Sequence, residues 1–395
     1  MIIVFWFSVI FVLYTYVLYP ILLWLFVRIK QSNGKYRRGD SKENKIEYHS
    51  KSSTDQHLES DLPTVTIIIA VYNGESYLHS KIQSLLSQNY PQDKLSIIFS
   101  SDGSNDNTIN ILESYSEIEL IRGQSRQGKA TALNRAVVNT DADIIVFTDV
   151  RQRLSGDAVL QLVKRLDDAA VGAVSGELLL ESSSDNSSHQ LGLYWEYEKF
   201  IRKHESKLHS VPGVTGALYA IRRIDYPLLN ENTLLDDFEV PISIIRKGKR
   251  VVFEENAIAY DKVSDSIGVE RQRKIRTLMG NYQSFSRNRW LFLPIANPIF
   301  WQFISHKFFR LLVPYFLIII LVLPLVIGGL WYQILFFIQL VFYVLALTAQ
   351  YFKSKSPLLK IINFCQVFLL MQLTVIVALY KYCLGHADSK WEHVH

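Results

Sequence analysis

The stretches VTIIIAVYN at 65–73, LSIIFSSDGS at 95–104 and DIIVFTDV at 143–150 decide the fold. Each contains a short, mostly apolar run, and segments with helical spacing separate the three stretches. Continuous apolar strands of about four to eight residues alternating with helices are typical of a sheet that is covered on both faces. The sequence therefore predicts an α/β domain with a mostly parallel sheet over residues 62–290.

Polar residues directly follow three of these strands, namely Asn73, Asp102 and Asp149. Ligands of open α/β sheets bind beyond the carboxyl ends of the strands. We therefore expect these three side chains to converge on one ligand-binding crevice.

Both ends of the chain read as membrane segments. Residues 2–27 contain no charged residue, and about 20 apolar helical residues are enough to cross a bilayer. The stretch lacks the basic start and the small-residue cleavage site of a signal peptide, so it is expected to stay as an anchor. Three further apolar stretches follow at 311–330, 331–352 and 361–384. Basic residues cluster after the first span, before the second and between the third and fourth, which predicts a cytoplasmic catalytic domain.

These observations divide the chain of 395 residues into six predicted parts. They are an N-terminal transmembrane anchor (1–29), a flexible linker (30–61), the α/β domain (62–290), an interfacial amphipathic segment (291–310), three transmembrane helices (311–385) and a tail (386–395).

Charge and cysteine content exclude several classes of protein. The net charge of +5 is modest and sits beside apolar spans, which favours membrane lipids over nucleic acid as the partner. Cys365 and Cys383 both lie in the last apolar stretch and are expected to be packing residues, since they form neither a disulfide framework nor a zinc motif.

The phosphate-binding motifs are not the common ones. No G-x-G-x-x-G follows the first strand and no G-x-x-x-x-G-K-[ST] occurs, which argues against dinucleotide oxidoreductases and P-loop ATPases. Instead the chain carries SDGSND at 101–106, GKATALN at 128–134 and TDVR at 148–151. These motifs resemble those of the family 2 glycosyltransferases, which have a nucleotide-sugar-binding GT-A fold and include makers of cellulose, chitin, hyaluronan and bacterial exopolysaccharides. The resemblance covers roughly residues 60–290, and the flanking apolar spans are similar to those of its membrane-bound members.

The resemblance implies a set of donor-binding residues. Ala70, Tyr72, Asn73 and Asp102 take the positions that bind the nucleotide base and ribose, and Lys129 takes that of the lysine that reaches the donor phosphates. A cation at a helix N-terminus suits a diphosphate. The alternatives are a plain Ser-Asp-Gly-Ser turn and a solvent-facing lysine.

TDVR resembles the D-x-D-type motif of the family, whose aspartates hold a divalent cation on the donor phosphates. The resemblance implies Asp149 as a ligand of Mg²⁺ or Mn²⁺, hard cations that prefer oxygen ligands. Arg151 replaces the second acid, which leaves its role open between phosphate contact and an outward orientation. The replacement also keeps open a catalytically silent protein that binds nucleotide sugars.

LLDDFEVP at 234–241 resembles the E-D motif of the family, whose second acid is the general base for the acceptor hydroxyl. The resemblance implies Asp237 as the base and Asp236 as the supporting acid, since an inverting transfer needs one carboxylate to accept that proton. The alternative is an acidic pair that merely stabilises a helix N-terminus.

Two further regions resemble parts of the family. In ERQRKIRTLMGNYQ at 270–283, Arg273 and Arg276 would reach the donor. The Q-x-x-R-W motif of processive members is incomplete, because Arg273 replaces its glutamine and Thr277 replaces its tryptophan. Contact with lipid headgroups is the alternative. Gly216 and Ala217 resemble a small-residue acceptor loop, and Trp195 is either an acceptor-stacking residue or a core residue.

Together these features predict a membrane-bound, inverting, metal-dependent glycosyltransferase of hexosyltransferase type. The expected donor is a nucleotide sugar such as a UDP-sugar, and the expected acceptor is a lipid-linked or growing polysaccharide of the cell envelope. The expected location is the cell membrane, with several spans and a cytoplasmic catalytic domain, and a synthase or export protein would be a compatible partner. A single-addition transferase acting on a polyprenyl-linked oligosaccharide is the nearest alternative.

Overall fold

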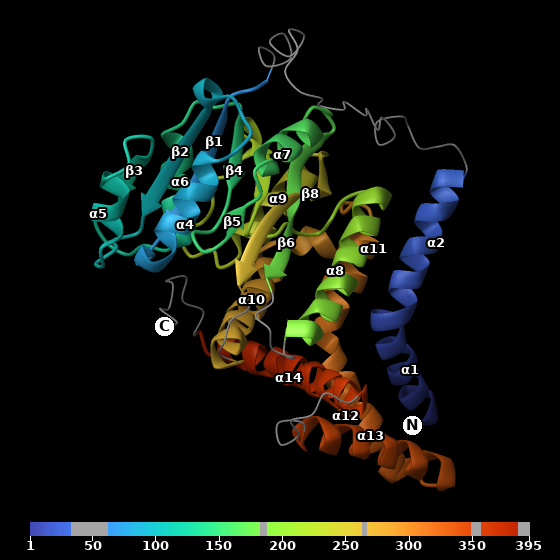
Figure 1. Cartoon of the computed structure of the whole chain (residues 1–395). Coiled ribbons are helices and arrows are strands. Elements are labelled where there is room, and N and C mark those ends of the chain that lie inside the picture. The colour runs from blue at the N-terminus through green and yellow to red at the C-terminus, as the bar shows by residue number, and fades with distance from the viewer. Residues whose placement is uncertain (33–61, 182–187, 263–266, 349–356, 386–395) are drawn as a thin grey trace. The chain divides into compact units, whose positions relative to one another are not determined.

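A computed structural model describes residues 1–32, 62–181, 188–262, 267–348 and 357–385. The predicted tail 386–395 and all but the first three residues of the predicted linker 30–61 lie outside the described residues. The chain divides into two compact units. We name them the sheet unit, within Phe26–Glu181 and Arg202–Lys262, and the helical unit, within Met1–Leu25, Ser182–Ile201 and Val263–Ala387 (Figure 1).

The sheet unit alternates strands and helices over its first half, as the sequence predicts. Its strands are β1 (Val65–Val71), β2 (Leu95–Ser101), β3 (Glu119–Arg122), β4 (Ile144–Phe147), β5 (Arg153–Leu154), β6 (Val171–Glu181), β7 (Tyr219–Arg222) and β8 (Arg250–Lys262). Its helices are α4 (Glu75–Leu86), η2 (Gln92–Lys94), α5 (Thr108–Glu113), α6 (Lys129–Val138), α7 (Ala158–Leu166), η3 (Arg223–Asp225) and α9 (Asp236–Arg246).

The eight strands form one sheet in the order β3-β2-β1-β4-β7-β6-β8-β5. The block β3-β2-β1-β4 is parallel, with Val65 of β1 aligned with Leu95 of β2 and Ile144 of β4. β7 runs antiparallel to both β4 and β6, and β5 runs antiparallel to β8. The predicted α/β class is confirmed, and the sheet is mixed.

The antiparallel strands β5 and β7 belong to the second half of the unit, where strands and helices still alternate along the chain. β7 lies between β4 and β6 and runs antiparallel to both, so the loop that precedes β7 lies next to the end of β4.

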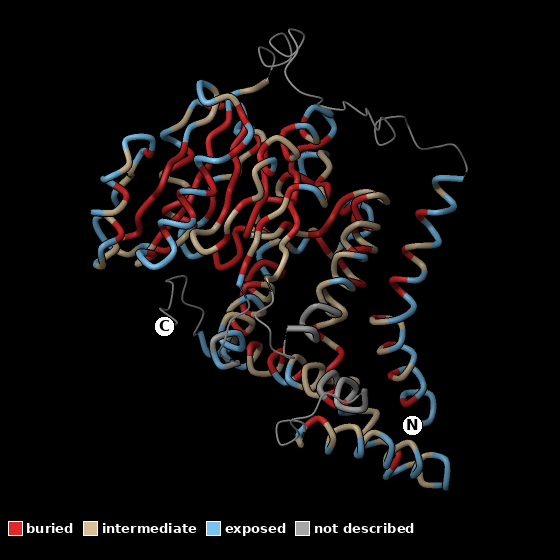
Figure 2. Tube along the Cα trace, viewed as in Figure 1, coloured by how far each residue is buried: buried red, intermediate tan, exposed pale blue. Residues whose placement is uncertain are grey.

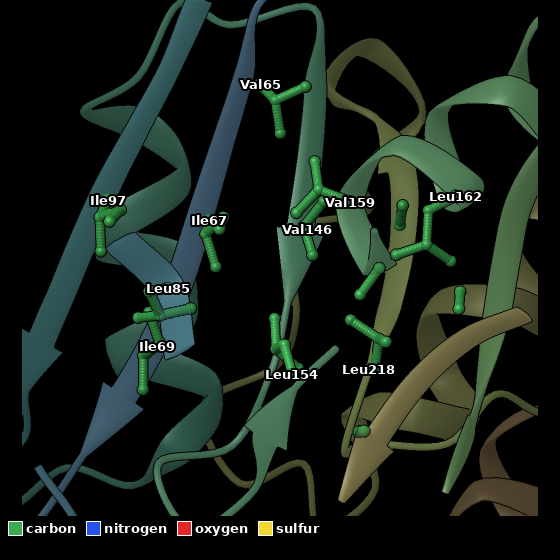
Figure 3. Close-up of a cluster of buried hydrophobic side chains, with 14 of the residues drawn as sticks. Val65, Ile67, Ile69, Leu85, Ile97, Val146, Leu154, Val159, Leu162 and Leu218 are labelled. Atoms are coloured by element: carbon green, nitrogen blue, oxygen red, sulfur yellow. The ribbon is translucent and has the colours of Figure 1, made fainter. Parts of the chain in front are cut away.

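The core of the sheet unit is apolar on both faces of the sheet. All seven residues of β1 are buried, which explains why six of the seven residues in VTIIIAV are apolar. Figure 2 shows the buried tube running through the strands, and Figure 3 shows β1 residues Ile67 and Ile69 among Ile97, Leu85 and Val146. α7 buries one stripe of side chains at helical spacing, and these are Ala158, Val159, Leu162, Val163 and Leu166.

The helical unit carries the long apolar helices. Its elements are α1 (Ile2–Leu13), η1 (Tyr14–Leu18), α10 (Ile267–Arg287), η4 (Arg289–Phe292), α11 (Phe300–Gln302), η5 (Phe303–Phe308), α12 (Phe309–Ile327), α13 (Leu330–Thr348) and α14 (Pro357–Cys383). α2 (Tyr19–Ser32) and α8 (Ser188–Leu208) contribute residues to both units.

Four helical segments of the described chain are long and apolar enough to cross a membrane. They are Ile2–Ser32, Phe300–Ile327, Leu330–Thr348 and Cys365–Cys383. The second begins at Phe300, inside the segment 291–310 that the sequence predicts to lie at the interface. α11, the π-helix η5 and α12 follow one another without a break there. The predicted domain boundaries otherwise stay predictions.

Aromatic and charged side chains join the helices within the helical unit. Phe11 of α1 packs against Phe309 and Phe316 of α12, with ring centroids 4.7 and 4.1 Å apart. Glu198 of α8 is mostly buried between Arg310 and His306, since its Oε2 lies 3.0 Å from His306 Nε2 and its Oε1 accepts a hydrogen bond from Arg310. Burial alone would raise the pKa of Glu198, but Arg310 and His306 outweigh it and hold that pKa well below its usual range.

Candidate active site

The carboxyl ends of three neighbouring strands meet where the sequence predicts a ligand site. β2, β1 and β4 are adjacent and parallel, and Asp102, Tyr72 and Asp149 follow their ends within two residues. Ala70 is a buried residue of β1, with 4% of its surface exposed. The topology thus gathers the predicted donor residues of the sheet unit along one sheet edge.

Asp102 is fully buried, and its carboxylate holds a loop of the protein itself. Oδ1 accepts the backbone N–H of Gln127 and Oδ2 accepts that of Gly128, each at 2.8 Å. Gly103, at φ +75°, packs so tightly that a β-carbon there would lie 2.9 Å from the carbonyl carbon of Ser125. The S-D-G-S turn therefore fixes the loop that leads into α6, and a direct contact of Asp102 with the donor stays a prediction.

Tyr72 and Asn73 are engaged by neighbouring loops. The guanidinium of Arg126 lies over the ring of Tyr72, with its central carbon 4.4 Å from the centroid. Asn73 and Asn105 exchange two hydrogen bonds, from Asn73 Nδ2 to Asn105 Oδ1 at 2.6 Å and from Asn105 N to Asn73 Oδ1 at 2.8 Å. Asn73 has φ +48°, a conformation that asparagine tolerates better than most residues. The donor functions of Tyr72 and Asn73 remain predictions.

Lys129 is the first residue of α6, and Gly128 precedes it with φ +101°. Its Nζ lies 2.8 Å from Asp149 Oδ1 and 3.1 Å from Asp236 Oδ1. Burial alone would lower the pKa of Lys129, but the charges of Asp149 and Asp236 outweigh it and raise that pKa above its usual range. Three predicted site residues from three different segments therefore form one charged cluster.

Asp237 joins the same cluster through Gly216. A β-carbon placed on Gly216 would lie 3.4 Å from Asp237 Oδ2 and 3.7 Å from Asp149 Oδ2, so the two carboxylates face the same point. The backbone N–H of Val214 also donates to the carbonyl of Asp237 at 2.9 Å. The carbonyl of Asp237 receives no helical hydrogen bond, because Pro241, four residues further on in α9, has no N–H.

The acidic residues at the start of α9 suit that position, since negative charge is favourable at a helix N-terminus. Asp236 is buried, and its Oδ2 has no hydrogen-bond partner. A buried carboxylate oxygen is stable only when a donor or a cation satisfies it. The cluster of Lys129 with three aspartates thus carries more negative charge than it balances.

A divalent cation fits this chemistry. Among the described residues no group of three or more His, Cys, Asp or Glu side chains is arranged by itself as a metal site. Hard cations also accept phosphate and water oxygens, so a site shared with a donor diphosphate needs fewer protein ligands. Oδ2 of Asp149, which faces Gly216, and the unpartnered Oδ2 of Asp236 are the candidate carboxylate oxygens.

Arg151, which stands where the family motif has its second acid, pairs with the buried Asp261 at the end of β8. Gln152 Nε2 donates to the same oxygen of Asp261 at 2.9 Å. Arg151 therefore forms an ion pair within the sheet unit, and a contact of Arg151 with the donor phosphates stays a prediction.

Three predicted site residues lie in the helical unit. Trp195 lies on α8, and Arg273 and Arg276 lie on α10. Arg273 Nη1 is 4.0 Å from Glu270 Oε2, one helical turn earlier. Their donor and acceptor functions remain predictions. In the sheet unit, Ala217 is buried, and its carbonyl oxygen accepts a hydrogen bond from Thr148 Oγ1 at 2.7 Å.

Several residues at the site were not predicted from the sequence. Arg126, Asp261 and Lys81 each contact a predicted residue or its neighbour. The burial of Lys81 could have been predicted, because the residue has the helical spacing of the apolar residues Leu78, Ile82 and Leu85 of α4. The contact of Asp261 with Arg151 could not have been predicted, because the two residues are 110 positions apart and no sequence periodicity links them.

The comparisons with known proteins agree with this geometry. Residues 66–226 match the model of the family described as Glycosyl transferase family 2. This match confirms, over residues 66–226, the resemblance that the motifs indicate.

Two curated relatives are similar to the chain over part of its length. The chain is 24% identical over 238 residues to the probable glycosyltransferase YdaM of Bacillus subtilis (strain 168), which covers 56% of each chain. It is 22% identical over 236 residues to the poly-beta-1,6-N-acetyl-D-glucosamine synthase of Staphylococcus aureus (strain COL), covering 58% of this chain and 57% of the relative. The chain therefore matches little more than half the length of these relatives.

A solved structure resembles the whole chain. The mannosyltransferase PcManGT from Pyrobaculum calidifontis, solved in complex with GDP-Man and Mn²⁺, superposes with a TM-score of 0.69 at 20% identity. The similarity covers 97% of this chain and 99% of that one. It confirms the GT-A-like fold.

Proposed function

We propose that this protein is a membrane-bound, inverting glycosyltransferase that transfers a sugar from a nucleotide-sugar donor to a lipid-linked or growing polysaccharide acceptor. The observation that carries the proposal is the cluster of Lys129 with Asp149, Asp236 and Asp237 around Gly216. The polysaccharide product is suggested by the name of the staphylococcal relative.

Asp237 is the proposed general base. In an inverting transfer the acceptor hydroxyl oxygen attacks the anomeric carbon, and the bond from that carbon to the diphosphate oxygen breaks. The carboxylate of Asp237 takes the hydroxyl proton, and the nucleoside diphosphate leaves. The position of Asp237 beside Gly216 of the predicted acceptor loop supports this role.

Lys129 and the N-terminus of α6 are proposed to bind the leaving diphosphate, because a cation and free backbone N–H groups stabilise the negative charge that develops on it. Asp149, with Asp236 beside it, is proposed to hold Mg²⁺ or Mn²⁺. When bound, the cation would neutralise charge on the donor phosphates. Arg273 and Arg276 are further proposed donor contacts, and Gly216, Ala217 and Trp195 are proposed acceptor contacts.

A purified preparation of the full chain in detergent would test the proposal with a panel of nucleotide sugars, UDP-sugars and GDP-mannose among them, with and without Mg²⁺ or Mn²⁺. Metal-dependent transfer from one donor is expected, with loss of transfer in Asp237→Asn and Asp149→Asn. Asp93→Asn is the matched control, because Asp93 is exposed on η2. Binding of a nucleoside diphosphate without turnover of any donor would instead identify a silent binding protein.

The product of the same reaction separates polymerisation from single addition. A ladder of increasing length from one acceptor indicates repeated transfer, whereas a single shifted product indicates one addition per acceptor. The incomplete Q-x-x-R-W motif is the sequence feature that favours single addition.

The proposed location is the cell membrane, with four spans and the sheet unit in the cytoplasm. Four sufficiently long apolar helices and the basic residues beside them support it. Ser116→Cys places a thiol on an exposed position of the sheet unit. With Cys365 and Cys383 replaced by serine, a membrane-impermeant maleimide should label it in inside-out vesicles and not in intact cells, and labelling of intact cells would contradict the proposed orientation.

A further inference from the structure

Lys81 is a fully buried lysine in the sheet unit, with 0% of its surface exposed. It lies on α4, on the face that packs Leu78, Ile82 and Leu85 against the sheet. Lysine is among the residue types that are almost never fully buried unless they are paired. Its position therefore calls for a physical reason.

Lys81 is held by hydrogen bonds to neutral acceptors. Its Nζ donates to Thr148 Oγ1 at 2.7 Å and to the backbone carbonyl of Gln152 at 2.8 Å. Burial lowers the pKa of Lys81 to about 7, against the opposing attraction of Asp149. Two acceptors match the two N–H groups of a neutral amine, so the side chain can remain buried with its donors satisfied.

Thr148 extends these bonds to the acceptor loop. Its hydroxyl has one hydrogen, which is donated to the carbonyl of Ala217 at 2.7 Å, so the same oxygen is the acceptor for Lys81. Thr148 directly precedes Asp149, and Ala217 directly follows Gly216. One chain of hydrogen bonds therefore joins α4, the end of β4 and the loop before β7.

Hydrogen bonds to β8 also hold the turn that follows Asp149. Arg151 and Gln152 both donate to the carboxylate of Asp261, whose side chain is 2% exposed. The segment 148–152, which carries Asp149, is thus bonded to α4 on one side and to β8 on the other. A strand-end turn with bonds on both sides has little freedom to shift its carboxylate.

We propose that Lys81 and Thr148 are positioning residues that set the Asp149 carboxylate against Gly216 of the acceptor loop. This inference rests on the proposed function, since it assigns the two residues to the metal and acceptor sides of that reaction. A misplacement of about 1 Å can cost roughly 100-fold in rate, so such bonds have a large effect on transfer without touching a substrate.

Thr148→Val and Thr148→Ser form a matched pair that tests the inference. Valine keeps the shape of threonine and removes the hydroxyl, whereas serine keeps the hydroxyl and removes the methyl group. We expect Thr148→Val to lower kcat by about 10- to 100-fold and to weaken Mn²⁺ binding in the presence of a nucleoside diphosphate, followed by electron paramagnetic resonance. Thr148→Ser should keep both within about threefold.

Lys81→Met is expected to act in the same direction as Thr148→Val, but it carries a greater risk of misfolding, so the threonine pair decides. A purely structural role would lower the unfolding temperature and leave kcat and Mn²⁺ affinity unchanged per folded molecule. That result for Thr148→Val, or equal losses of kcat in Thr148→Val and Thr148→Ser, would overturn the inference.

The failure of the proposed function would look different. If the wild-type protein turned over no donor, the proposed function would fail, while Mn²⁺ binding to the same variants would still report whether Thr148 positions Asp149. Weaker Mn²⁺ binding in Thr148→Val alone supports the inference even then, and equal binding in wild type and both variants overturns it.

Discussion

The two units each enclose a cluster of ionisable side chains, and the central group is a lysine in the sheet unit and an acid in the helical unit. In the sheet unit one lysine, Lys129, lies among aspartates, and Asp236 keeps an oxygen without a partner. In the helical unit one acid, Glu198, lies between His306 and Arg310, and both of its oxygens are bonded. Oδ2 of Asp236 is therefore a candidate ligand for a cation, whereas each oxygen of Glu198 already has a protein partner that joins α8 to η5 or α12.

The helical cluster should respond to mutation as a structural pair. Glu198→Leu leaves Arg310 and His306 without their acid, and removal of one partner from a buried pair costs about 3–5 kcal/mol of stability. The unfolding temperature in detergent measures it. Glu196→Leu, at an exposed position of the same helix, is the control and should change little. Equal effects of the two variants would show that Glu198 stabilises nothing specific.

The sheet cluster should respond in transfer rate. Lys129→Met removes the cation that faces Asp149 and Asp236, and loss of one charge-stabilising donor lowers kcat by about 100- to 1,000-fold. Lys249→Met is the matched control, because it also breaks a lysine–aspartate pair, with Asp225 at 2.6 Å, away from the site. Steady-state transfer per folded molecule compares them, and a similar kcat in both would remove Lys129 from the mechanism.

Two lysines of the sheet unit differ in pKa, since that of Lys81 is below the usual value and that of Lys129 is above it. Between about pH 7 and 10.5 the folded state binds fewer protons at Lys81 than the unfolded state does. The free energy of unfolding therefore increases with pH there, by up to about 1.4 kcal/mol per unit from this group. Urea unfolding from pH 7 to 9 should show a steeper rise for wild type than for Lys81→Met, and parallel curves would contradict the buried neutral amine.

The smallest effect is expected from a methyl group added between the two carboxylates. Gly216→Ala places a carbon 3.4 Å from Asp237 Oδ2 and 3.7 Å from Asp149 Oδ2, an ordinary contact that needs no backbone change. It should lower kcat/KM for transfer by about tenfold, since it occupies space that faces both carboxylates. Gly213→Ala meets Phe238 and Asp237 at similarly ordinary distances of 3.5 and 3.6 Å and should stay near wild type.

Local patterns predict much of the fold and part of the site. The apolar runs indicate the parallel strands, and parallel neighbours align their carboxyl ends, so the sequence alone is enough to expect Asn73, Asp102 and Asp149 along one sheet edge. The four apolar helices follow from length and composition. The antiparallel entry of β7 does not follow, because no local residue pattern states which strand is its neighbour.

The parts of the site that escape prediction depend on pairing across long separations. The motif shows that Arg151 stands where the family has a second acid. It does not show that Arg151 pairs with Asp261, which lies at the end of a different strand. By its motif Asp102 is a donor ligand, but its carboxylate also holds the backbone of Gln127 and Gly128. A motif states which residues are present, whereas the partner that occupies each polar atom is set by tertiary packing.

Pro241 leaves the carbonyl of Asp237 without a hydrogen bond from within α9, and the backbone N–H of Val214 donates to that carbonyl instead. An alanine at this position would restore the N–H that completes the helix, and that N–H would compete with Val214 for the carbonyl of Asp237. A substitution that raises helix propensity would thus loosen the loop that carries Gly216 from the proposed base. At this turn, engineering for thermal stability and engineering for catalysis would select opposite residues.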